Sequence, residues 1–95
     1  MFGLDKLMAL KNQAEEVKAR LNTVTVEGDA AGGKIIVHAN GNRKITHILI
    51  DENWMRNAEK EELEDLILTA INRALEKAEA VSESEMRSLM PGLGF

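Results

Sequence analysis

Two histidines, His38 and His47, are the side chains of this 95-residue chain best suited to acid–base or metal chemistry. Both stand in segments of β-strand pattern and share one face by alternation, but a two-residue hairpin loop does not pair them directly. The chain has no cysteine, and two imidazoles without a third protein ligand make a poor structural zinc site. We therefore expect ordinary sheet residues here, with no metal and no cofactor.

Other arrangements for catalysis are incomplete. The segment 28–33, Gly-Asp-Ala-Ala-Gly-Gly, is rich in glycine like a phosphate-binding loop, but it lacks the Gly-Lys-Ser/Thr ending and precedes a strand pattern. No histidine lies near any serine in the sequence, which leaves the hydroxyl nucleophiles without a base; the serines are Ser82, Ser84 and Ser88. We predict a hairpin connection at 28–33, no catalytic residue and no small-molecule substrate.

The remaining chemistry is the binding of phosphate groups by basic side chains. Residues 1–50 carry seven Lys or Arg and five Asp or Glu, whereas residues 51–95 carry five and eleven, within a net charge of −4. An acidic total slows encounter with DNA, but a basic patch still acts within a Debye length of about 8 Å. The alternative is a set of salt bridges or solvated charges. The candidate phosphate contacts are Lys6, Lys11, Lys18, Arg20, Arg73, Lys77 and Arg87.

Two helices are expected to carry these basic residues. In residues 1–22 the apolar positions alternate steps of three and four, which predicts an amphipathic helix whose basic side chains flank a narrow seam. A second helix is predicted over residues 57–88, with Asn57 as its N-cap and a broad apolar face. At 1.5 Å per residue it spans about 45 Å and must overhang strands of about 23 Å. Residues 89–95 are expected to form a flexible tail.

Residues 24–51 predict a three-stranded antiparallel meander, with breaks at 28–33 and 40–42. One face carries the core side chains Ile35, Val37, Ala39, Thr46, Ile48 and Ile50. The opposite face is too apolar to meet only water, because Ile36, Ile45 and Leu49 lie there beside Lys34, His38, Arg43 and His47. A second copy of the chain is the economical cover, so these three apolar residues are the candidate homodimer interface. Trp54 is expected to close the edge of the core.

Length and composition indicate one α+β domain over residues 1–95. Asp5, Lys6 and Lys11 interrupt the N-terminal segment, which therefore lacks the apolar core of a signal peptide. No stretch reaches the roughly 20 apolar residues of a membrane span. We expect a cytoplasmic protein without a membrane partner.

The order of these segments resembles the YbaB/EbfC family of nucleoid-associated proteins over essentially the whole chain. The features that carry the resemblance are the opening MFG, the strands VTVEGDAAGGKIIVHANGNRKITHILID, the helix LEDLILTAINRALEKA and the closing MPGLGF. The resemblance implies a homodimer with projecting helices, no catalytic site, and duplex DNA as the partner in chromosome organisation or control of expression.

This interpretation predicts contacts to the phosphate backbone, with the seven basic residues on the helices as the candidates and a location at the nucleoid. The alternative is an acidic dimeric adaptor or chaperone that binds another protein and no DNA. An enzyme is not expected, because the chain lacks a nucleophile, a base and a pocket that belong together.

Overall fold

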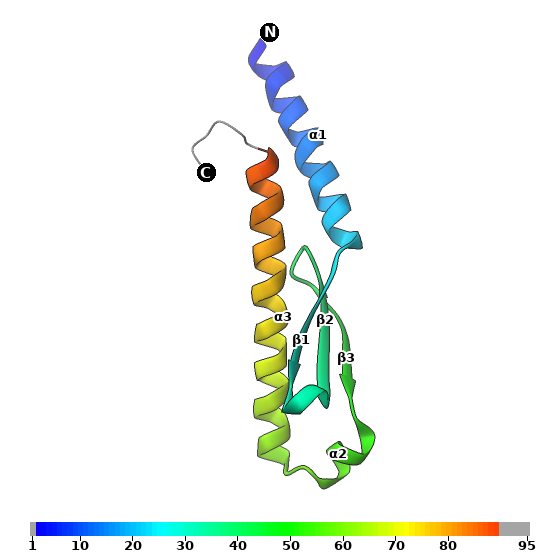
Figure 1. Ribbon diagram of the computed structural model, residues 1–95. Coiled ribbons are helices and arrows are strands. Elements are labelled where there is room, and N and C mark those ends of the chain that lie inside the picture. The colour runs from blue at the N-terminus through cyan, green and yellow to red at the C-terminus, as the bar shows by residue number, and fades with distance from the viewer. Residues whose placement is uncertain (1, 90–95) are drawn as a thin grey trace.

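The computed structural model describes residues 2–89 and has a helix, a sheet and a long helix in that order (Figure 1). The strands form one antiparallel sheet in the order β1-β2-β3. The predicted α+β meander between two helices is therefore confirmed. The elements are α1 (Phe2–Thr23), β1 (Thr25–Ala30), the 3₁₀ turn η1 (Ala31–Gly33), β2 (Ile35–Asn40), β3 (Ile45–Ile50), α2 (Glu52–Asn57) and α3 (Lys60–Leu89).

The entry into the long helix differs from the prediction. Asp51 caps the separate helix α2 by accepting a hydrogen bond from the backbone N–H of Trp54, and Asn57 ends α2. Ala58 is extended at φ −81° and ψ 145°, so the chain turns before α3 begins at Lys60. The prediction of Asn57 as the N-cap of the long helix is wrong, because Asp51 starts a helix earlier. Leu89 still belongs to α3, and the rest of the expected tail, residues 90–95, lies outside the described residues.

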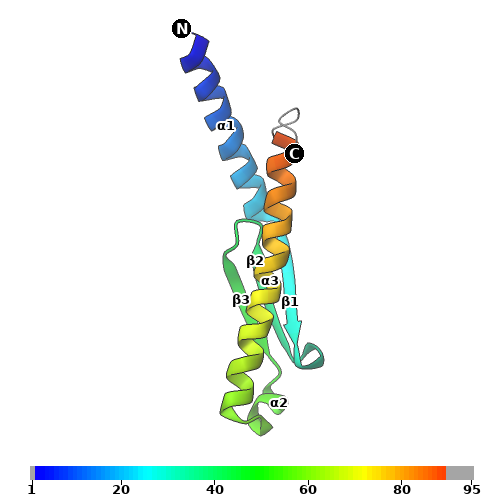
Figure 2. The same ribbon diagram turned by 90° about the vertical axis from the view of Figure 1, so that its left-hand side faces the viewer.

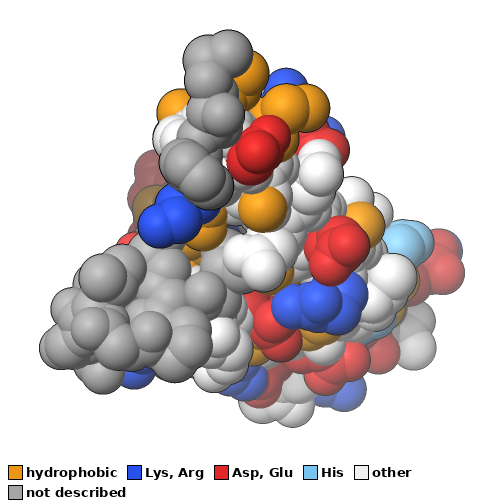
Figure 3. Space-filling view, turned by 90° about the horizontal axis from the view of Figure 1, so that it is seen from above, with side chains coloured by type: hydrophobic (Ala, Val, Ile, Leu, Met, Phe, Trp, Pro, Cys, Tyr) orange, Lys and Arg blue, Asp and Glu red, His pale blue; other side chains and the backbone are white. Residues whose placement is uncertain are grey.

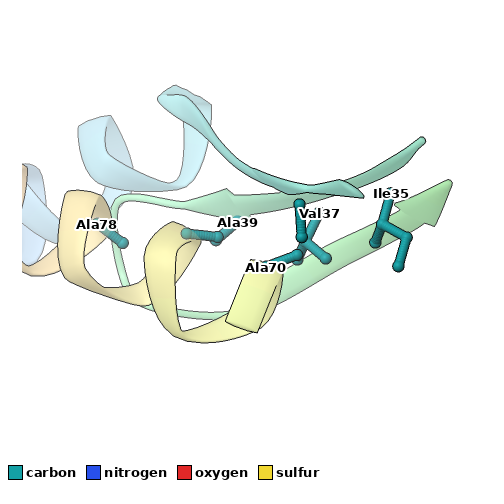
Figure 4. Close-up of a cluster of buried hydrophobic side chains, with 7 residues drawn as sticks. Ile35, Val37, Ala39, Ala70 and Ala78 are labelled. Atoms are coloured by element: carbon teal, nitrogen blue, oxygen red, sulfur yellow. The ribbon is translucent and has the colours of Figure 1, made fainter. Parts of the chain in front are cut away.

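The core lies between one face of the sheet and α3. The inward side chains of β2 are completely buried, and they point at a row of alanines spaced one helical turn apart (Figure 4). The small alanine side chains let the helix backbone approach the sheet closely. Trp54 packs against the edge of this cluster, as expected. The fully buried residues are Ile35, Val37, Ala39, Ala70, Ala74 and Ala78.

Gly28 lies inside β1, and the prediction that it opens the hairpin connection is wrong. A Cβ built on Gly28 would stand 2.3 Å from both the carbonyl oxygen of Ala70 and the backbone nitrogen of Ala74. Only a residue without a side chain allows α3 to lie this close to the strand. The connection itself is Ala31–Gly33, which joins two antiparallel strands as predicted.

The β2–β3 hairpin combines a three-residue loop with a β-bulge. Asn40 and Lys44 close the loop through a hydrogen bond of 2.9 Å, which alone would bring His47 opposite Val37 on the helix side. A bulge shifts the register so that His47 lies opposite His38, with ring centroids 5.7 Å apart. The predicted separation of the two histidines is therefore wrong, because it assumed a two-residue loop. Their predicted face is right, because the bulge restores the alternation.

The same bulge moves one candidate interface residue. Ile45 pairs with Ala39, a residue of the helix-facing side, so the expectation that it shares a face with Ile36 and Leu49 is wrong. Ile36 and Leu49 are cross-strand partners, as the predicted face requires. In addition, α3 covers β1 and β2 but little of β3, which leaves Ile48 47% exposed on the core side.

Both long helices extend beyond the same end of the sheet (Figures 1 and 2), and their axes are inclined to each other in both views. The molecule measures 65 × 23 × 17 Å with a radius of gyration of 18.2 Å, compared with roughly 12 Å for a compact domain of this length. The overhang follows from helix length, as predicted. Among residues 2–89, no helix combines the length and the apolar character that crossing a lipid bilayer requires.

Candidate nucleic-acid interface

Helix α1 is anchored at its C-terminal end only. Val17 and Leu21 are buried, and the Leu21 carbonyl oxygen accepts a hydrogen bond of 2.9 Å from the backbone N–H of Gly41. The N-terminal half has little cover, since Leu7 is 65% exposed and Leu10 is 46% exposed. Figure 3, which looks along the molecule from this end, shows hydrophobic and basic side chains together at the surface.

Three lysines of α1 are exposed along this projecting helix: Lys6, Lys11 and Lys18. Within residues 2–89, no carboxylate lies within 4.0 Å of their ammonium groups. Lys11 and Lys18 are seven residues apart, so they lie on one side of the helix about 10 Å from each other. Of the alternative, salt bridges or solvated charges, these three lysines show the solvated form, and they are available to an external anion.

Two predicted phosphate contacts have intramolecular partners in the structure. The Arg20 guanidinium forms a salt bridge of 3.0 Å with Glu85, which ties α1 to α3. Arg73 donates a hydrogen bond of 2.7 Å to the carbonyl oxygen of Asp29 and so joins α3 to β1. Both side chains hold the helices in place.

The last two candidates, Lys77 and Arg87, lie on the exposed surface of α3. The same part of that helix carries more acidic than basic side chains, which weakens the local attraction for phosphates. The acidic residues near them are Glu76, Glu79, Glu83 and Glu85. The arrangement therefore favours α1 over α3 as the phosphate-binding element.

The hairpin loop adds two basic residues that the sequence interpretation did not include among the DNA contacts, Arg43 and Lys44. The Asn42 side-chain amide donates a hydrogen bond of 2.9 Å to the Lys18 carbonyl oxygen, which holds the loop against α1. Gly41 permits this contact, because a Cβ there would stand 2.7 Å from the Leu21 side chain. The sequence assigned Arg43 to the outer sheet face, whereas the structure places it in the loop. In the sequence, the signal for this basic loop is the pair of adjacent basic residues that follows the Asn-Gly turn.

Part of the acidic charge lies far from this surface, whereas Asp5, Glu15 and Glu16 lie on α1 itself. The first turns of α3 carry Glu61, Glu62, Glu64 and Asp65, at the end of the molecule opposite the tip of α1 (Figure 1). These acids are separated from the tip of α1 by a large part of the 65 Å long axis. This distance is several times the Debye length of about 8 Å at physiological salt. Salt therefore screens these four acids at the tip of α1, where the nearer charges of α1 and of the C-terminal part of α3 set the local field.

Comparison with known proteins identifies the family. The sequence model of the YbaB/EbfC DNA-binding family matches residues 3–93. The chain belongs to the YbaB/EbfC DNA-binding family. A nucleoid-associated protein of Bradyrhizobium diazoefficiens is 38% identical over 95 residues, which cover 99% of this chain and 90% of that protein. A nucleoid-associated protein of Chloroflexus aggregans is 37% identical over 84 residues, covering 88% and 84%.

The fold of this YbaB/EbfC chain also has a match among solved structures. The crystal structure of the uncharacterized protein HP0035 from Helicobacter pylori superposes with a TM-score of 0.79 and covers 90% of this chain and 89% of that one. The two sequences are 16% identical, so this likeness concerns the fold alone.

The outer sheet face offers a different kind of site, formed by one residue from each strand. Glu27, His38 and His47 are successive cross-strand partners, and His38 Nε2 lies 2.9 Å from Glu27 Oε1. Within the part of the chain that the structure describes, no three His, Asp or Glu side chains are arranged to hold a metal ion. In this YbaB/EbfC chain the two histidines are neighbouring sheet residues, and the His38 ring contacts the Glu27 carboxylate.

Proposed function

We propose that the protein binds duplex DNA through the phosphate backbone, with α1 as the main contact surface. The observation that carries this proposal is the set of three exposed lysines on α1, Lys6, Lys11 and Lys18, without a carboxylate within 4.0 Å among residues 2–89. Ammonium groups bind phosphates as point charges and carry no base-specific information. Membership of a DNA-binding family supports the same partner. We infer a nucleoid location in the cytoplasm and a role in chromosome organisation or expression, in line with the names of the relatives.

Salt dependence provides the test of this mode of binding. If two chains contribute three lysine contacts each, the affinity for a labelled duplex should fall about 1,000-fold between about 50 and 200 mM salt, because each contact releases counterions. Fluorescence anisotropy of the duplex measures this fall. Absence of binding at the low end, or binding that salt does not weaken, would contradict phosphate-backbone recognition.

We further propose that the protein acts as a homodimer, with β3 in the interface. This strand lies at the edge of the sheet and is exposed on both faces, since Ile48 is 47% exposed and Leu49 is 50% exposed. An uncovered apolar edge strand invites pairing with another strand. A second copy would cover these side chains and place two α1 helices in one assembly, which doubles the number of phosphate contacts.

The interface has its own test. Leu49→Glu should convert the protein from a dimer to a monomer at micromolar concentration, because an unpaired carboxylate would be buried on association. Leu68→Glu is the matched control, since Leu68 is 57% exposed on α3 and away from β3. Sedimentation equilibrium gives the mass. A native chain that sediments as a monomer, or a Leu49→Glu variant that remains dimeric, would show that this strand is not the interface.

One observation favours a second function, a protein-binding adaptor. The projecting half of α1 exposes a set of large apolar side chains that phosphates cannot bind: Leu4, Leu7, Met8 and Leu10. Such a patch fits an amphipathic partner helix. Recovery of a single protein partner from lysate that persists after nuclease treatment would support this adaptor, whereas loss of all partners after nuclease would support DNA binding.

A further inference from the structure

Arg43 adopts a backbone conformation that its residue type disfavours. Its φ is +64°, in the left-handed region, where glycine and asparagine are tolerated and longer side chains are strained. Strain of this kind persists only where the surrounding structure imposes it, and it is concentrated at functional sites. The position therefore raises the question of what the Arg43 side chain contributes.

The surrounding loop fixes this conformation without using the Arg43 side chain. The Arg43 N–H donates to the Asn40 carbonyl oxygen at 3.0 Å, and the Asn40 side-chain oxygen accepts hydrogen bonds from the N–H groups of Asn42 and Lys44. The guanidinium is exposed, and within residues 2–89 it makes no hydrogen bond or salt bridge. Glycine at this position would serve the fold better, and the exposed guanidinium can contact a ligand.

The location of the loop indicates what the Arg43 side chain contacts. Asn42, the residue before Arg43, is bonded to the Lys18 carbonyl oxygen, which places Arg43 at the base of the basic helix α1. A guanidinium presents a planar set of donors that fits a phosphate in a bidentate manner, and a rigid loop loses little freedom on binding. We propose that Arg43 is a phosphate-contacting residue that extends the α1 surface onto the hairpin tip. This inference rests on the proposed DNA binding.

The test uses substitutions that relieve strain and remove charge together. Arg43→Gly and Arg43→Asn should keep or raise the thermal unfolding midpoint, because both residues tolerate positive φ. The same variants should bind a short labelled duplex more weakly. The slope of log affinity against log salt should decrease in magnitude by about 1 for each chain in contact with the duplex.

Ala31→Gly is the matched control, because Ala31 also has a positive φ, 55°, and lies in the β1–β2 connection, at the opposite end of β2 from Arg43. It should stabilise the fold and leave DNA affinity and salt slope unchanged. Native-like affinity and slope in both Arg43 variants would overturn this inference alone, as would a clear drop in their stability. Absence of DNA binding by the native chain would overturn the proposed function and this inference with it.

Discussion

Replacement of Gly28 by alanine is expected to destabilise the protein by about 3 kcal/mol or more. The added methyl carbon would lie 2.3 Å from backbone atoms of Ala70 and Ala74, and helix backbone cannot rotate aside as a side chain can. Relief requires α3 to move off β1, which opens the core around Val37. Urea unfolding followed by circular dichroism measures the loss.

Gly3→Ala provides the control for that measurement. Gly3 lies in α1, and apart from its chain neighbours and the nearby backbone of its own helix, no atom of the described residues lies within 4 Å of the position that its Cβ would occupy. The same chemical change should therefore be neutral there or stabilising by up to about 1 kcal/mol. A Gly28→Ala variant as stable as the native chain would show that α3 does not lie on β1 as described.

Reversal of charge at Lys6, Lys11 and Lys18 is expected to have the largest effect on DNA binding. The triple substitution by glutamate replaces three attractive contacts per chain with three repulsive ones, which should lower affinity at about 50 mM salt by at least about 100-fold. The sites are exposed on α1, so the helix content should be retained. Anisotropy of a labelled duplex and far-ultraviolet circular dichroism measure the two quantities.

A second triple variant distinguishes the effect of where the charges lie from the effect of the net charge. Lys34, Arg56 and Lys60 lie towards the other end of the molecule, near η1 and α2, and their substitution by glutamate changes the net charge equally (Figure 1). Their surface ion pairs with Asp51 and Glu52 contribute little to stability. This variant should bind DNA much more strongly than the α1 variant. Equal losses in both would show that long-range charge, and not α1, governs binding.

The sheet and the two long helices have different roles in this fold. The sheet and the alanine row of α3 form a rigid base, and the Arg20–Glu85 salt bridge adds a tie between the two helices above it. Lys6 and Lys11 stand on the part of α1 that projects beyond this base, and Lys18 is exposed beside the anchored residue Val17. A small domain can in this way present lysines without carboxylate partners, although its total charge is negative.

Much of this organisation could be predicted from local pattern. Alternation in β2 predicted which side chains are buried, and the 3.6-residue period predicted the inward face of the long helix. These predictions succeeded because Ile35, Val37 and Ala70 each follow from burial on one face of one element. The family resemblance, carried by the order of elements and turns, is confirmed by the match over residues 3–93.

The hairpin could not be predicted in detail. The face on which a strand side chain lies depends on whether the pairing register is odd or even. Beyond the bulge the register has the predicted parity, so His47 keeps its predicted face but has a different partner. Between the loop and the bulge the parity is the opposite one, so Ile45 lies on the other face. A three-residue loop and an additional strand residue are small differences in local sequence. Their combined effect depends on how β3 pairs with β2, which is a property of the folded sheet.

The sequence by itself determined the order of elements, the faces that are buried and the presence of basic residues on α1, because each follows from the periodicity and type of neighbouring residues. Tertiary structure decided which charges remain available. Arg20 and Arg73 lie far along the chain from Glu85 and Asp29, so only folding brings each pair together. Folding likewise set Arg43 beside α1, because a hydrogen bond between Asn42 and Lys18 joins segments that the sequence separates.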